Sequence, residues 1–149
     1  MAADAKLTDL GLDKYIKQMT GLRGRGVKVG IQAGEGSQDG VDLLDIAIFQ
    51  VYGTENIQKR DFMGDFFDKN EKVLGLAMDR MADSVAQGDS IDRALGELGE
   101  FVEGGQKEHI QQSKRWATPN KPSTIRQKGS DTPLIDEGLM LGAVRAQKL

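Results

Sequence analysis

The chain of 149 residues has no cysteine, a single histidine and a single tryptophan. Without cysteine it can form no disulfide, thiol nucleophile or thiolate metal site, and one histidine leaves little for zinc. Long hydrophobic runs are missing too, because the most apolar stretch, residues 43–52, contains Asp45 and Gln50, whereas a membrane-spanning helix needs about 20 apolar residues. We therefore expect no cofactor, no metal and no membrane as a partner.

Neither sign of charge dominates, since 20 Lys and Arg face 23 Asp and Glu, for a formal net charge of −3. This balance does not indicate nucleic acid as a partner of the whole surface. The length and the 38% of hydrophobic residues are typical of one globular domain. Residues 1–6 lack a basic region followed by a hydrophobic segment, so we expect no secretory signal and synthesis in a cytoplasm.

The spacing of apolar residues predicts four helices and two strands. The helices are expected over residues 8–20, 43–52, 62–85 and 91–110, and the strands over 27–33 and 139–145. Thr8 or Asp9 is expected to cap the first helix, and residues 34–40 to form a flexible loop. Gly88 and Ser90 supply stop and cap signals between the last two helices, which predicts a helical hairpin.

Two features of these elements can be checked directly in a structure. The apolar stripe from Phe62 to Val85, which includes Val73, Leu74 and Met78, is expected to be buried. Gly30 is expected on the outer face of its strand. The last helix contains four glycines, each of which costs about 1 kcal/mol relative to alanine, so either backbones approach closely there or the helix bends or breaks near residue 104. They are Gly96, Gly99, Gly104 and Gly105.

Residues 113–132 hold two of the three prolines and show no helical or strand period, which predicts a long extended loop or arm. The arm is basic and carries the only tryptophan. Trp and Arg anchor protein interfaces, so we expect it to bind a protein partner, and Trp116→Ala to weaken assembly with little effect on stability. A small nucleic-acid-binding protein that uses residues 114–128 is the alternative. The residues are Lys114, Arg115, Trp116, Lys121, Arg126 and Lys128.

Nothing in the sequence points to catalysis. His109 is interpreted as an exposed helix residue, because no Ser or Asp motif accompanies it. The glycine-rich stretch 34–40 contains Glu35 and Asp39, which would repel a phosphate. The paired carboxylates at residues 42 and 45 and at residues 65 and 68 fall at expected helix starts, where solvated acids are common. We therefore expect no catalytic residue and no enzyme.

Three motifs, in this order along residues 27–144, together resemble one protein family. They read V-K-V-G-I at 27–31, D-I-A-I-F-Q-V-Y-G-T at 45–54 with K-R-D-F-M at 59–63, and P-L-I-D-E-G-L-M at 133–140. This series is similar to the minor tail or tail-completion proteins of tailed bacteriophages, also described as neck or virion-morphogenesis components. Asp61 stands where that family usually has proline, and Glu137 where it has threonine.

The resemblance implies a single α+β domain over residues 1–149, with a small antiparallel sheet packed against several helices. It implies a non-enzymatic virion protein of the tail or neck, assembled in the host cytoplasm, that completes the tail or joins tail to head as a ring, with a hexamer favoured. Its partners would be the tail tube or tail terminator and the head connector, and genome DNA would pass without specific binding. The motif residues expected to be structural are Tyr52, Gly53, Thr54, Arg60, Phe62, Leu134, Ile135 and Gly138.

Ring contacts of this kind join two different patches on each subunit. We expect the Trp116 arm to form one patch. The other is expected to be either residues 34–42 or the glycine-containing helix.

Overall fold

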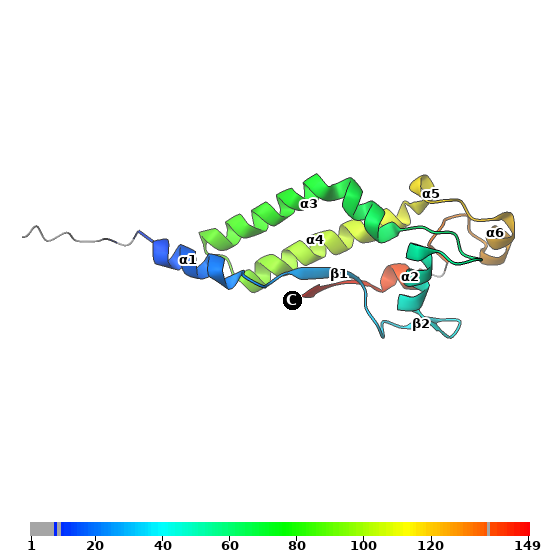
Figure 1. Cartoon of the computed structure of the whole chain (residues 1–149), viewed down its shortest axis with the longest axis horizontal. Coiled ribbons are helices and arrows are strands. Elements are labelled where there is room, and N and C mark those ends of the chain that lie inside the picture. The colour runs from blue at the N-terminus through cyan, green and yellow to red at the C-terminus, as the bar shows by residue number, and fades with distance from the viewer. Residues whose placement is uncertain (1–7, 9, 137) are drawn as a thin grey trace, which may run out of the picture.

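The computed structural model describes residues 8, 10–136 and 138–149 of the chain, which form an elongated α+β molecule (Figure 1). The predicted fold class is confirmed. The helices are α1 (Leu12–Gly21), α2 (Leu43–Tyr52), α3 (Phe62–Gln87), α4 (Ile91–Gln111), α5 (Ser113–Trp116), α6 (Pro122–Lys128) and α7 (Leu139–Gly142). The strands are β1 (Val27–Ile31), β2 (Ser37–Gln38), β3 (Val41–Asp42) and β4 (Val144–Lys148).

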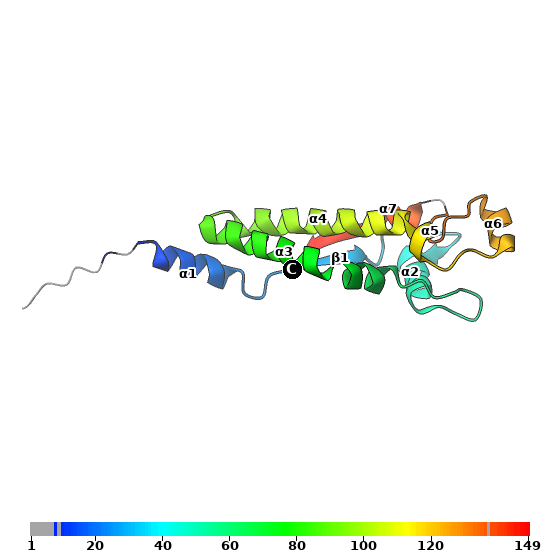
Figure 2. The ribbon, with the colours of Figure 1, turned by 90° about the horizontal axis from the view of Figure 1, so that it is seen from above.

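The predicted hairpin of α3 and α4 forms the long axis of the molecule (Figure 2). Asp61 caps α3 by accepting a hydrogen bond from the Gly64 N–H at 2.8 Å. Gly88 ends α3 in the left-handed region (φ 115°), which other residues rarely adopt, and Ser90 is the N-cap of α4. Local signals thus fix both ends of the connection.

The main sheet pairs β1 with β4 in antiparallel register, from Val27 opposite Lys148 to Ile31 opposite Val144. The predicted strand over 139–145 is therefore wrong in its bounds. Gly138, with φ 77°, precedes the short helix α7, and the chain becomes extended only where β1 offers pairing partners. Gly30 is buried under Met63 of α3, whose Cε lies 3.3 Å from where a Cβ would be, so its predicted outer position is also wrong.

Part of residues 34–40, predicted to be a flexible loop, belongs to a second small sheet that continues to residue 42. Strands β2 and β3 pair with Ser37 opposite Asp42, and the turn between them is Asp39-Gly40. Both turn residues have positive φ, 51° and 80°, as a type I′ hairpin turn requires. The Asp-Gly pair was the signal in the sequence that favoured this hairpin.

Helix α4 lies across the β1–β4 sheet, and glycines permit this close approach. A Cβ on Gly99 would lie 3.0 Å from Ala146 Cβ and 3.1 Å from Val27 Cγ1, and one on Gly105 would lie 3.0 Å from Phe66 Cζ. Helix α4 continues through Gly104 without a break. Of the two alternatives predicted for this helix, close approach is confirmed and interruption is wrong.

The hydrophobic core is concentrated at the end of the molecule that holds α2 and α7. Its buried cluster joins α2, the start of α3, the end of α4, the segment before α7, α7 itself and β4. Its members are Ala47, Phe62, Ile110, Leu134, Met140 and Val144. Along the hairpin, by contrast, Val73 and Met78 are exposed and Leu74 is only half-buried, so the predicted burial of the whole stripe is wrong.

Helix α1 projects from the opposite end of the molecule (Figure 1). It begins at Leu12 rather than at residue 8, and its N-cap is Gly11, which supplies no side-chain cap. Thr8 lies outside the helix, and the other predicted cap, Asp9, lies outside the described residues. No helix within the described ranges has the length and apolar character needed to cross a bilayer.

We expect the glycines of α4 to respond oppositely to substitution. Gly104→Ala should raise the free energy of unfolding by about 0.5–1 kcal/mol, because a Cβ there meets nothing within 4 Å and alanine favours the helix. Gly99→Leu should lower it by about 1–3 kcal/mol through overpacking against β1 and β4. Urea denaturation of both variants checks this; equal effects would contradict the proposed close contact.

Candidate interaction surface

The segment over 113–132 is folded onto the domain rather than extended. It forms α5 and α6, so the predicted extended arm is wrong in its local structure. Pro122 at the first turn of α6 and Gly129 (φ 70°) after its last residue suit a short helix. The buried Ser113 hydroxyl donates a hydrogen bond to the Pro133 carbonyl, which ties the two ends of the segment together.

Trp116 anchors α5 to α4. Its ring stacks on His109, with ring centroids 4.4 Å apart and planes inclined by 11°, and its Nε1 donates to the His109 carbonyl at 2.9 Å. Lys69 Nζ lies 5.7 Å from the centroid of the Trp116 ring. Trp116 is half-buried against the core, so the expectation that its removal leaves stability unchanged does not fit the structure.

His109 is not the exposed residue that the sequence suggested. Its side chain is only 11% exposed, and its Nε2 lies 2.8 Å from Asp65 Oδ2. Burial lowers the pKa of His109 below its ordinary value of 6.5; the Asp65 carboxylate opposes this shift, and Lys69 adds to it. Among the residues that the structure describes, no three His, Asp or Glu side chains gather in a way that suits a metal ion.

The other predicted partner-binding residues do not form one surface. Lys114 is paired with Asp131, whereas Arg115 and Arg126 are exposed. Lys121 and Lys128 line a pocket that also contains Arg60. The sequence grouped these cations because they follow one another along the chain, but α5 and α6 turn them in different directions.

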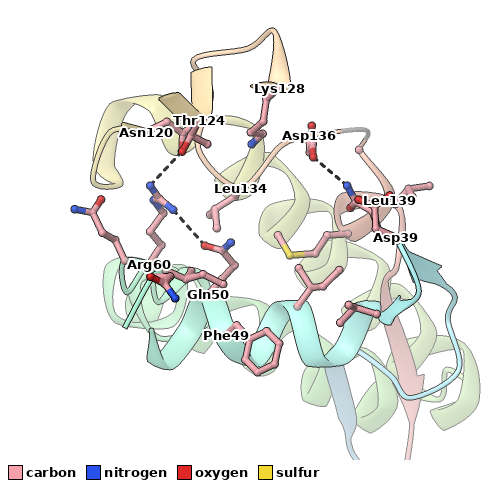
Figure 3. A pocket seen from close by; sticks show the side chains of 18 of the residues that line it. Asp39, Phe49, Gln50, Arg60, Asn120, Thr124, Lys128, Leu134, Asp136 and Leu139 are labelled. Carbon is pink, nitrogen blue, oxygen red and sulfur yellow. Dashed lines mark hydrogen bonds between the residues drawn. The ribbon is translucent and has the colours of Figure 1, made fainter. Parts of the chain in front are cut away.

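That pocket has a volume of about 470 Å³ and lies between α2, α6, α7 and the β2–β3 hairpin (Figure 3). Apolar side chains of α2, α7 and Leu134 line part of it. The polar groups lie around them, with Arg60 and Asn120 on one side, Asp136 on the other and Lys128 between them. Two of the recognised motifs, those containing Arg60 and Leu134, therefore meet here although the chain separates them widely.

Arg60 joins α2 to the linker between α5 and α6. Its Nε donates to the Thr118 carbonyl at 2.8 Å, Nη1 donates to Gln50 Oε1 at 3.3 Å, and Nη2 donates to the Pro119 carbonyl at 3.4 Å and to Asn120 Oδ1 at 3.1 Å. Burial lowers the pKa of Arg60. The predicted structural role of this motif residue thus has a physical basis, because one guanidinium satisfies four acceptors.

Two hydrogen-bond donors, those of Asn120 and Lys128, belong to residues that line the pocket. Asn120 is buried, and its Nδ2 has no hydrogen-bond partner within the described part of the chain. Lys128 is half-buried; this burial lowers its pKa, while Asp136 opposes the shift. Asp136 itself accepts a hydrogen bond from Gln38 Nε2 at 3.0 Å. The pocket therefore suits a partner group that accepts hydrogen bonds.

The remaining motif residues divide between core and surface. Phe62 and Leu134 share the buried cluster, and Ile135 packs against it. Gly53 ends α2 with φ 77°, and Thr54 Oγ1 accepts from the Ile57 N–H, so both shape the turn after α2. Tyr52 is exposed, and Gly138 lines the pocket next to α7.

Two apolar grooves flank the hairpin, and the sequence did not predict either of them. The first, which we call the β1 groove, has a volume of about 500 Å³ and is lined by Val27, Val29, Phe67, Asp68, Glu71, Leu74, Gly75, Met78, Leu98 and Val102. The second, the α3–α4 groove, has a volume of about 340 Å³ and includes Val73, Leu76, Ala77, Met81, Leu98 and Phe101. Met78 is 57% exposed and Leu76 is 58% exposed.

Comparison of the chain with protein-family models, with curated proteins and with solved structures finds no match.

We expect Trp116→Ala to lower the free energy of unfolding by roughly 2 kcal/mol, about half the cost of removing a fully buried aromatic side chain, because Trp116 is half-buried. Urea denaturation measures this. Arg115→Ala, at the exposed neighbouring position, is the matched control and should change stability by no more than about 0.5 kcal/mol. A Trp116→Ala variant as stable as this control would contradict the packing of Trp116 and would support the extended arm that the sequence predicted.

The buried His109 makes stability depend on pH. Because its pKa is lower in the folded chain, the unfolded chain binds more protons just below pH 6.5, and the free energy of unfolding falls as the pH drops through that value. His109→Phe keeps an aromatic ring against Trp116 but cannot be protonated. Urea midpoints measured at about pH 8 and about pH 5.5 should therefore fall less for this variant than for the natural chain. If the urea midpoints of the variant and the natural chain fell equally between the two pH values, His109 would not be the source of the pH dependence.

Proposed function

We propose that the chain is a structural virion protein of a tailed bacteriophage, which completes the tail or joins tail to head as a subunit of a homo-oligomeric ring. A hexamer is favoured. The sequence motifs supply the family, and one structural observation carries the mode of action: large apolar side chains lie exposed along both grooves of the α3–α4 hairpin. Exposed apolar patches of this kind mark interaction sites.

The placement of the motifs supports this proposal. Residues from the second and third motifs, Phe62 and Leu134, pack in one buried cluster, and Arg60 and Gly138 line one pocket. The motifs thus build a rigid end of the domain rather than a reaction centre. In this role the protein acts in the tail or neck of the virion, after assembly in the host cytoplasm.

The pocket beside Arg60 is a second surface for a partner. Its half-buried Lys128 suits carbonyl or carboxylate groups of a neighbouring protein. The tail tube, the tail terminator and the head connector are the proposed neighbours. Genome DNA would pass through the ring without specific binding.

The alternative, nucleic-acid binding through residues 114–128, gains little from the structure. The ring of Trp116 is stacked on His109 and is not free to stack on a base, and Lys114 is paired with Asp131. Retention on DNA that falls steeply with salt, and falls further when Arg115 and Arg126 are neutralised, would favour this alternative.

Sedimentation of the purified chain, alone and with each proposed neighbour, tests the assembly function. We expect a species larger than the monomer, and Met78→Asp should dissociate it because a charge replaces an exposed apolar side chain of the β1 groove. Lys72→Asp, an exposed position on the same helix that lines neither groove, is the matched control. A chain that sediments only as a monomer, alone and with every neighbour, would contradict the proposal.

A further inference from the structure

Helix α1 is oriented with its polar side toward its own chain. Lys14 and Gln18 face the turn between α3 and α4. A Cβ placed on Gly88 in that turn would lie 3.6 Å from Lys14 Nζ and 3.8 Å from Gln18 Nε2. Three side chains of the apolar stripe point away: Leu12 is 65% exposed, Ile16 is 51% exposed, and Tyr15 is exposed as well, whereas Met19 near the end of the helix is half-buried. No residue of α1, all of which the structure describes, is buried.

This orientation is the reverse of what a surface helix adopts in a complete domain, where the apolar stripe faces the core. The stripe of α1 repeats at the spacing of one helix face, through Leu12, Tyr15, Ile16 and Met19. A helix of this length is marginal in water without a surface that covers its apolar side. Within the described part of the chain, Leu12, Tyr15 and Ile16 of this apolar face therefore stay exposed.

We propose that α1 of one copy of the chain docks its apolar stripe into the β1 groove of a second copy. The inference rests on the proposed function, because it assumes that copies of the chain assemble. The groove is lined by apolar side chains from α3, α4 and β1, among them Phe67, Leu74 and Met78. It is thus the apolar counterpart of the stripe.

Length and charge both fit this pairing. The ten residues of α1 span about 15 Å, and the α3 side of the groove, from Phe67 to Met78, spans about 17 Å. The groove is edged by Asp68 and Glu71, and its lining includes no Lys or Arg. Lys14 lies beside the Gly88 turn of its own chain, but Lys14 and Lys17 together outnumber the one acid of α1, Asp13, so the helix as a whole carries a net positive charge toward a negative rim.

The α3–α4 groove offers no such charge match, because both Arg80 and Glu97 line it. The choice of the β1 groove also sets the symmetry of the contact. The donor, α1, and the acceptor, the β1 groove, are different patches of one subunit, so the contact is heterologous and repeats from copy to copy. Contacts of this kind close into rings when the rotation between copies permits.

The absence of cysteine from the chain makes a disulfide test direct. In the variant Ile16→Cys with Met78→Cys, mild oxidation should produce a ladder of covalent oligomers on a non-reducing gel. The matched control is Ile16→Cys with Leu76→Cys, which places the second thiol in the α3–α4 groove at a position of similar exposure. The control should cross-link at least about fivefold less.

A ladder from the Leu76 pair equal to that from the Met78 pair would overturn the inference. The inference would also be overturned if the cysteines at positions 16 and 78 formed a disulfide only within one chain, which a non-reducing gel shows as a monomer band of higher mobility. Sedimentation separates this failure from failure of the proposed function: oligomers that persist without the Met78 ladder contradict only the docking of α1, whereas a chain that is monomeric with every neighbour contradicts both.

Substitution on α1 gives a second readout without oxidation. Ile16→Asp should shift the natural chain from oligomer to monomer while its thermal unfolding as a monomer stays unchanged, because Ile16 is not buried in its own chain. Thr20→Asp places the same charge on the same helix away from the stripe and should leave the oligomer intact. Equal assembly by both variants would overturn the inference.

Discussion

The contact on which the rest of the structure depends is the approach of α4 to the β1–β4 sheet at Gly99. Because no side chain separates the helix from Val27 and Ala146, α4 lies directly on the two strands. Six residues further on, Gly105 leaves room for the Phe66 ring, which brings α3 against the other side of α4. One helix with two glycine contacts thus holds the sheet and the hairpin in a fixed relation.

This arrangement distributes stability unevenly along the molecule. At one end, the buried cluster around Phe62 and Leu134 is reinforced by the Arg60 bonds and by the Trp116–His109 stack. Along the hairpin, two helices and two strands are too few to cover every apolar side chain, and Leu76 and Met78 stay exposed. The well-packed end is where the motif residues lie, and the uncovered length is where copies of the chain would meet.

Elements governed by local signals were predictable from the sequence. Helix α2 has the predicted bounds, and the hairpin follows from its apolar period and from Gly88 and Ser90. What failed depends on contacts between distant residues. The last strand begins where β1 offers hydrogen bonds, and Gly30 is buried because Met63 crosses over it. Periodicity shows that a helix has an apolar face, but it does not show whether another element covers that face. The two grooves therefore could not be predicted from the sequence.

The Arg60 guanidinium is held by hydrogen bonds to neutral, dipolar groups rather than by an ion pair with a carboxylate. Its acceptors are the carbonyl oxygens of Thr118 and Pro119 and the amide oxygens of Gln50 and Asn120, none of which gains or loses a proton in the ordinary range. Dissolved ions weaken attraction between exposed opposite charges far more than short bonds in a buried site. The linkage of α2 to residues 118–120, in the linker between α5 and α6, therefore depends little on pH or on ionic strength.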